Sequence, residues 1–374
     1  MSAVTVLKPG LFTTVQDMGR SGWRASGVAA GGAMDTYALR VANLLVGNAA
    51  DSACLELTLT GATLRVERDL LVAVTGAYMA PEADGAEVPM WRPVWMAAGT
   101  TLSLGRTRAG CRAYVAAAGG FVVAPVLGSR SADVRAGFGG GFARPLAAGD
   151  TLLIGEAEGA EGRDSHARAA APHGDGSRQA RDAAAWAAAW AAALAQRAAE
   201  ERRRWAPPAW FAPPEAYGGA DAADGIVLRA MPGGAFGSFT AEARERLFRE
   251  PYRVAPASDR MGCRLSGLPL ERTDRAELRS RGIMPGAVQV PPGGQPIVLA
   301  ADCQTTGGYP VIAHVATADL PLLAQAKPGD SLRFREVTVA EAQRLDLERE
   351  ASLRMLAAGL LGRTPAAPIP ASAR

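Results

Sequence analysis

Lysine is nearly absent from this sequence of 374 residues. Lys8 and Lys327 are its only lysines, so almost all of the 40 basic residues are arginines. A phosphate-binding P-loop needs a Gly-Lys-Ser/Thr step, and neither lysine follows a glycine. A lysine that carries biotin stands on a tight turn, usually between methionines, whereas both lysines here precede proline. The sequence therefore excludes a standard P-loop ATPase and a biotin carrier.

Long apolar runs and closely spaced cysteines are also missing. No apolar run reaches the roughly 20 residues of a membrane helix, and the N-terminal region lacks the pattern of a signal peptide. We therefore expect a cytoplasmic protein without membrane contact. The cysteines are far apart and form no C-x-x-C pair, which favours reduced core residues over disulfides or a metal site. They are Cys54, Cys111, Cys263 and Cys303.

Charge of one sign is not in excess. The 40 basic and 37 acidic residues give a net charge of +3, and the basic residues are spread along the chain. This distribution gives no support to nucleic-acid binding. The length exceeds the roughly 250–300 residues at which single cores usually split, so we expect two globular units.

Short apolar runs separated by glycine-containing turns fill most of the sequence, as in LELTLTGATLRV and LLVAVTGA. These runs have the length and β-branched content of strands, and the absence of regularly alternating helices argues against Rossmann and TIM architectures. We predict a mainly β protein with two β-barrel-like lobes, a few helices and an Ala-rich helical insert. The predicted parts are an N-terminal lobe at 1–155, the insert at 156–225, a C-terminal lobe at 226–340, and a helix with a disordered tail at 341–374.

Two helices can be placed within these parts. Apolar residues at three- and four-residue spacing predict an amphipathic helix between Met34 and Gly47. In the insert, Trp186, Trp190 and Leu194 repeat every four residues along an Ala-rich stretch. This apolar edge would dock on the body or on a partner, or it would belong to a loosely held surface helix.

Polar residues gather in four glycine-rich segments. The first segment, 9–35, favours an anion held near a helix start or a simple turn and helix cap. The second, 126–150, favours a carboxylate or phosphate ligand or a solvated loop. In the third, 256–267, Asp259 and Arg260 are adjacent. They are candidate site residues or, alternatively, form an ion pair that holds the loop. The fourth, 286–315, would orient a small amide or lactam, or would form a hairpin whose side chains bond their own turn.

A nucleophilic triad is hard to assemble from the three histidines. His166 and His173 lie in the low-complexity insert, and His314 lies within an apolar run. His314 is therefore more typical of a core or partner-facing residue than of a catalytic base.

The motifs of both lobes resemble the biotin-dependent carboxyltransferase-like family. This family includes the C subunit of 5-oxoprolinase, KipA, the second subunit of allophanate hydrolase and the carboxyltransferase part of urea amidolyase. The matching stretches cover residues 4–155 and 226–338, and they include PGLFTTVQDMGRSG, LGSRS, SDRMGCRLSG and GAVQVPPGGQPIVLAADCQTTGGYP. The resemblance implies two cyclophilin-like β lobes with the site between them.

The resemblance implies, first, a 5-oxoprolinase C subunit that works with a KipI-like B subunit and an A subunit. Such a complex opens 5-oxoproline, a small-molecule substrate, to glutamate with ATP. The alternatives are carboxyl transfer from carboxybiotin to urea or a related amide, and a KipA-like antagonist of a kinase inhibitor. The chain carries no biotin itself, so carboxybiotin would be a substrate.

We predict that residues of both lobes line one cleft and hold no metal. The predicted catalytic residues are Asp35, Asp259, Asp302, Gln304 and Tyr309. The predicted substrate-binding residues are Ser129, Arg130, Arg260, Gln289, Thr305 and Thr306.

Overall fold

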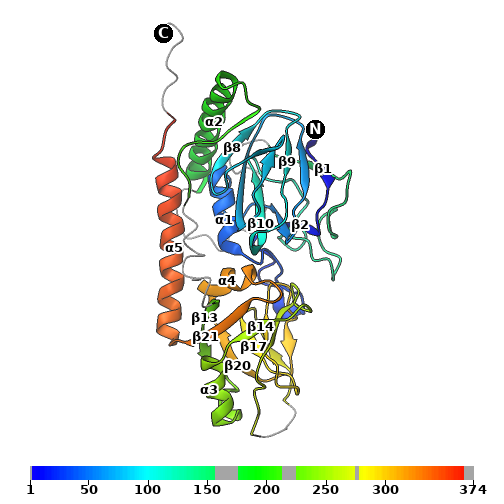
Figure 1. The fold of residues 1–374 in the computed structure, drawn as a ribbon, viewed down its shortest axis with the longest axis vertical. Coiled ribbons are helices and arrows are strands. Elements are labelled where there is room, and N and C mark those ends of the chain that lie inside the picture. Colours follow the sequence, from blue (N-terminus) through cyan, green and yellow to red (C-terminus); the bar gives the residue numbers. More distant parts are fainter. Residues whose placement is uncertain (1, 156–175, 213–224, 274–277, 366–374) are drawn as a thin grey trace. The chain divides into compact units, whose positions relative to one another are not determined.

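The computed structural model describes residues 2–155, 176–212, 225–273 and 278–365, which divide into two units (Figure 1). Unit 1 comprises Met1–Met18, Tyr37–Pro213 and Leu353–Arg374, and unit 2 comprises Gly19–Thr36 and Pro214–Ser352. Each unit thus combines segments that are distant in sequence. Most elements are strands, so the prediction of a mainly β fold with few helices is confirmed.

The strands of unit 1 form two six-stranded sheets within the described residues. The first has the order β11 (Thr151–Leu153), β1 (Ser2–Lys8), β4 (Thr63–Val66), β9 (Thr101–Ser103), β6 (Glu82–Ala83) and β7 (Ala86–Glu87). The second has the order β12 (Trp205–Ala206), β8 (Pro93–Met96), β5 (Leu70–Tyr78), β10 (Ala109–Ala117), β3 (Cys54–Thr58) and β2 (Phe12–Gln16).

Strand β5 shows why the runs of this lobe are continuously apolar. Leu70, Val72 and Val74 belong to the hydrophobic core of unit 1. The alternate residues of β5 point to the opposite face of the sheet and are buried too. On that face the Thr75 hydroxyl donates a hydrogen bond of 2.7 Å to the carbonyl of Ala38 in α1 (Thr36–Leu45). Because both faces are covered, no polar alternation is required.

The two helices predicted from spacing are present. Helix α1 buries Ala38, Val41, Ala42 and Leu45, as its periodicity predicted. Helix α2 (Gly176–Glu200) packs its apolar edge within unit 1, where Trp186 is 7% exposed and Leu194 is 3% exposed. The indoles of Trp186 and Trp190 both donate hydrogen bonds to the Arg363 carbonyl. The apolar edge of α2 is therefore docked on the body of the protein.

Unit 2 is built around a closed seven-stranded barrel. Around the barrel the strands follow the order β13 (Ile226–Pro232), β20 (Val311–Val315), β17 (Ala287–Gln289), β18 (Ile297–Leu299), β15 (Gly262–Ser266), β14 (Tyr252–Val254) and β21 (Ser331–Glu336). The pair β13–β21 is parallel and the other barrel pairs are antiparallel. A separate two-stranded ribbon joins β16 (Arg281–Gly282) to β19 (Thr306–Gly307).

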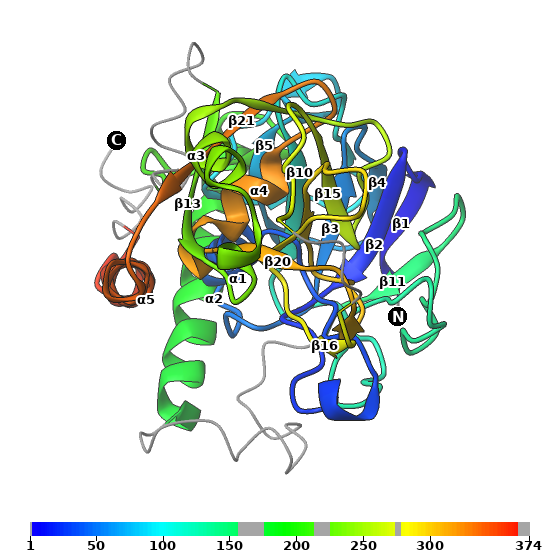
Figure 2. The same ribbon diagram turned by 90° about the horizontal axis from the view of Figure 1, so that it is seen from below.

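Helices cover part of the barrel wall. Helix α3 (Ala241–Arg249) contacts β21, and helix α4 (Leu320–Gln325) contacts β13 (Figure 2). Short 3-10 turns occupy Arg24–Ser26, Phe236–Ser238 and Thr317–Asp319. The C-terminal helix is α5 (Val339–Leu361), and the predicted tail after residue 365 lies outside the described residues, as do 156–175 and 213–224 of the predicted insert. In the ranges that the structure describes, no helix is long and apolar enough to cross a membrane.

Candidate active-site segments

The carboxylate of Asp17 organises the Gly-Ser-Arg-Ser loop of unit 1. Its Oδ1 accepts hydrogen bonds from the hydroxyls of Ser129 (2.6 Å) and Ser131 (2.5 Å), and its Oδ2 accepts one from the backbone N–H of Arg130 (2.5 Å). Asp17 is 6% exposed and both serines are fully buried. Charge-assisted bonds of this kind are among the stronger ones in proteins, so Asp17 fixes the backbone of the loop.

Local backbone geometry then presents Arg130. Leu127 and Gly128 both have positive φ angles, 53° and 78°, and form a tight turn closed by the Val126–Ser129 bridge. Arg130 is half-buried, and its guanidinium has no carboxylate partner among the described residues. A positive side chain held in this way is suited to a carboxylate ligand. The Ser129 hydroxyl, by contrast, donates to Asp17 and stabilises the loop.

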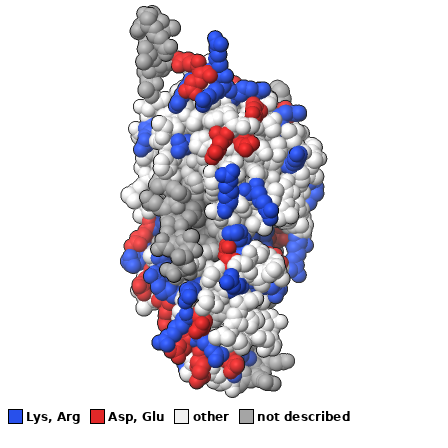
Figure 3. Space-filling model, in the orientation of Figure 1, with Lys and Arg blue, Asp and Glu red and all other residues white. Residues whose placement is uncertain are grey.

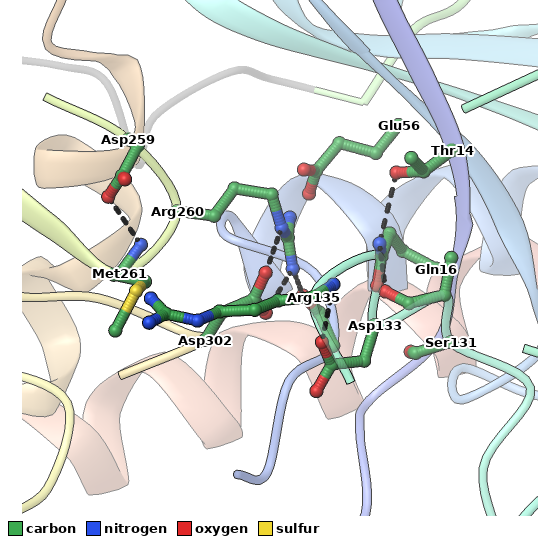
Figure 4. A network of polar contacts seen from close by, with 12 residues as sticks. Thr14, Gln16, Glu56, Ser131, Asp133, Arg135, Asp259, Arg260, Met261 and Asp302 are labelled. Atoms are coloured by element: carbon green, nitrogen blue, oxygen red, sulfur yellow. Dashed lines mark hydrogen bonds and ion pairs between the residues drawn. The ribbon is translucent and has the colours of Figure 1, made fainter. Parts of the chain in front are cut away.

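Unit 1 also contains buried polar residues that the sequence did not single out. The Tyr114 hydroxyl donates to Glu56 Oε2 at 2.6 Å, and both side chains are buried. The Asp133 carboxylate accepts hydrogen bonds from the backbone N–H groups of Arg135 and Ala136 (Figure 4). Glu56 and Tyr114 lie within alternating strand runs, so only their pairing across β3 and β10 distinguishes them from ordinary strand residues.

In unit 2, Arg260 and Asp302 form a two-pronged ion pair. Arg260 Nε donates to Asp302 Oδ2 at 2.7 Å and its Nη2 to Oδ1 at 2.8 Å (Figure 4). The same Nη2 donates to the carbonyl of Gly32 at 2.6 Å. The side chains are 10% and 14% exposed. This pair joins the third and fourth glycine-rich segments to the end of the first, so the structure brings two predicted site residues together.

Two other predicted catalytic carboxylates have structural partners. Asp35 is fully buried and accepts a hydrogen bond of 2.8 Å from the side chain of Gln325 in α4. Asp259 is exposed, and its Oδ1 accepts from the backbone N–H groups of Met261 and Gly262. Asp259 therefore closes its own turn, and Arg260 pairs with Asp302 rather than with its neighbour.

The remaining predicted residues lie along the β19 region. Gln289 in β17 is 2% exposed, and its Nε2 has no hydrogen-bond partner in the part of the chain that the structure describes. Gln304 and Thr306 are exposed, Thr305 is half-buried, and Tyr309 is 49% exposed. Arg24, which the sequence did not single out, donates to the carbonyls of Ile283 and Gln304 and so ties the first segment to this region. A shared pocket that also includes Ser129 and Arg130 of unit 1 stays a prediction.

Gly307 is required for the position of Gln289. A Cβ atom at residue 307 would stand 2.8 Å from Gln289 Nε2 and 2.9 Å from Ile283 Cδ1. We expect Gly307→Ala to lower the free energy of unfolding by about 2 kcal/mol through overpacking, and to displace the Gln289 amide. Urea denaturation measures the first effect. Gly282→Ala is the matched control, because a Cβ there meets nothing within 4 Å; equal losses in both variants would contradict the assignment.

The burial of the four cysteines predicts how they react with a thiol reagent. All four cysteines are buried and free. Burial raises the pKa of the Cys54 thiol and of the Cys303 thiol above the usual value. Because the thiolate is the reactive form, the native protein at pH 8 should leave both unmodified by a disulfide thiol reagent, and all four should react after unfolding in guanidinium. Rapid modification of Cys303 in the native protein would show that it is accessible.

The comparison with protein families decides the assignment. Residues 26–336 match the family described as carboxyltransferase domain, subdomain A and B. The chain belongs to this family. The match begins at Ser26 and ends with β21, so it includes the second, third and fourth glycine-rich segments and the end of the first.

Individual relatives agree with that membership. The chain is 37% identical over 353 residues to the 5-oxoprolinase C subunit of Escherichia coli, covering 94% of this chain and 97% of that protein. It is 30% identical over 370 residues to urea amidolyase of Lachancea kluyveri, covering 96% of this chain but only 18% of that protein.

Solved structures show the same fold. The urea amidolyase of K. lactis matches with a TM-score of 0.76 and 27% identity over 95% of this chain and 20% of that one. The structure of TTHA0988 matches with a TM-score of 0.67 and 33% identity over 89% of this chain. The chain spans about half of TTHA0988, at 55%.

Proposed function

We propose that this chain is the C subunit of a 5-oxoprolinase, which acts with A and B subunits in the ATP-dependent hydrolysis of 5-oxoproline to L-glutamate. The observation that carries the proposal is the similarity to the 5-oxoprolinase C subunit of Escherichia coli over nearly the full length of both proteins. The 5-oxoprolinase C subunit of Haemophilus influenzae supports it, at 34% identity over 92% of its length. A cytoplasmic location is part of the proposal.

The side chains support a reaction on a small acidic amide. Hydrolysis adds water to the ring carbonyl, breaks the lactam C–N bond, and yields a second carboxylate and an amine. We assign a substrate-binding role to Arg130, as the sequence predicted, and the orientation of the lactam to residues with hydroxyl, amide and carboxylate groups. These are Asp302, Gln304, Thr305, Thr306 and Tyr309, with Gln289 behind them.

The two lysines of this chain do not form a P-loop. Lys327 is held in an ion pair with Asp330 at 3.0 Å, and Lys8 lies in β1 immediately before Pro9. Neither lysine stands in a glycine-rich phosphate loop, so the residues of this chain do not fit a P-loop nucleotide site. The face drawn in Figure 3 carries both basic and acidic side chains.

Reconstitution tests the proposal. The chain is co-purified with its A and B subunits, and glutamate and phosphate are measured with 5-oxoproline and ATP. We expect both products in equal amounts, and only when all three subunits are present. A stable complex of the three proteins that forms neither product would contradict the proposal and favour a KipA-like binding role.

Carboxyl transfer to urea or a related amide is the second candidate. The family description and the urea amidolyase similarity favour it. In that reaction carboxybiotin is a substrate delivered by another protein, and the same polar groups would orient the urea nitrogen. Formation of allophanate from carboxybiotin and urea by the purified complex, without turnover of 5-oxoproline, would establish this candidate instead.

A further inference from the structure

A small cavity lies within unit 2, beside the ribbon of β16 and β19. Its volume is about 160 Å³, and its lining includes Arg279, Arg281, Gly307, Tyr309 and His314. A water molecule takes up about 30 Å³ of liquid, so the cavity has room for a small organic molecule. Of the residues predicted from sequence, only Tyr309 lines it. Gln289 and Gln304 lie next to it at Gly307, their Nε2 atoms 2.8 and 3.7 Å from where a Cβ would stand.

The charge at this cavity comes from two arginines. Both Arg279 and Arg281 are exposed, and neither guanidinium has an acidic partner among the described residues. The backbone at Arg281 is held by its pairing with Gly307 of β19. Two guanidinium groups that no described carboxylate pairs, at one small cavity, favour a carboxylate ligand, whose two oxygens match their planar donors.

Most of the remaining wall is apolar and is formed by residues such as Ile283, Met284 and Val311, but it includes two polar, uncharged side chains. His314 in β20 is half-buried, and burial lowers its pKa, so the ring is neutral at pH 7. A neutral imidazole both donates and accepts a hydrogen bond, as does the Tyr309 hydroxyl. Next to Gly307, the 2% exposed Gln289 has an Nε2 atom for which no described residue provides an acceptor. Such a buried donor is costly unless something accepts from it.

We infer that this cavity binds a small carboxylate that also carries a neutral amide, with Arg279 and Arg281 on the carboxylate and His314 and Tyr309 on the amide. The inference rests on the proposed function in one respect, since 5-oxoproline is the member of this class that the complex would encounter. It assigns carboxylate recognition in unit 2 to two arginines that the sequence motifs did not indicate.

Calorimetric titration with 5-oxoproline tests the inference, on the full chain alone and in the complex with the A and B subunits. We expect saturable binding that Arg281→Gln and Arg279→Gln each weaken about tenfold, as for loss of one hydrogen bond to a charged group. Acetamide, which lacks the carboxylate, and acetate, which lacks the amide, should bind far more weakly. Arg106→Gln, at an exposed arginine of unit 1, is the control and should leave the Kd unchanged.

The outcomes separate this inference from the proposed function. No binding in either sample, or a Kd that ignores both arginine substitutions, overturns the cavity assignment even if the complex turns over 5-oxoproline. Equal affinity for acetate overturns the role of the amide. Arginine-sensitive binding in a complex without turnover keeps the cavity and overturns the proposed function.

Discussion

Replacing Asp302 with asparagine should lower the free energy of unfolding by about 3 kcal/mol and abolish turnover of the reconstituted complex. The substitution keeps the shape of the side chain but removes the charge opposite Arg260, whose side chain is only 10% exposed. Breaking one side of a buried ion pair is costly because the remaining charge stays desolvated. Urea denaturation followed by circular dichroism measures the stability, and glutamate formation measures the activity.

Asp330→Asn is the matched control for this substitution. Asp330 pairs with Lys327 at 3.0 Å, but the two side chains are 26% and 39% exposed. Water screens such a pair, and the asparagine still accepts the hydrogen bond from the Lys327 backbone N–H, so we expect a loss of less than about 1 kcal/mol. If the two variants lost equal stability, the buried Arg260–Asp302 pair would contribute no more to the free energy of unfolding than the exposed Lys327–Asp330 pair. Full activity in Asp302→Asn would remove Asp302 from the proposed site.

Replacing Asp17 with alanine should have an effect of similar size in unit 1. The change leaves the hydroxyls of Ser129 and Ser131 and the N–H of Arg130 without their common acceptor. Each buried donor left unsatisfied costs about 1–3 kcal/mol, and partial relaxation of the loop reduces the sum, so we expect a loss of about 3 kcal/mol. Because Arg130 would lose its fixed backbone, KM for 5-oxoproline should rise at least tenfold.

Asp69→Ala provides the comparison for Asp17. Its carboxylate accepts one hydrogen bond of 2.9 Å from the Ala98 N–H at an exposed position. We expect a loss of less than about 1 kcal/mol and an unchanged KM. A variant at Asp17 that binds and turns over 5-oxoproline normally would show that the Gly-Ser-Arg-Ser loop does not hold the substrate.

The sequence by itself determined the class of fold and the family. Strand-length apolar runs predicted the β architecture, and the spacing of Ala38, Val41 and Leu45 predicted α1, because local periodicity directly reports which face of an element is buried. The near absence of lysine was enough to exclude a P-loop and a biotin carrier. Ordered motifs in residues 4–155 and 226–338 predicted the carboxyltransferase family, which the comparisons confirm.

Tertiary structure alone decided the partners of the polar residues. Asp259 and Arg260 are adjacent in sequence, yet Arg260 pairs with Asp302, 42 residues away, and Asp259 bonds its own turn. Asp17 bonds Ser129, which lies 112 residues further along the chain. Glu56, Tyr114, Arg24, Arg279 and Arg281 carried no recognisable signal. Local pattern shows that a residue is polar, but strand pairing and barrel closure decide which polar groups share a buried site, because those contacts join distant parts of the chain.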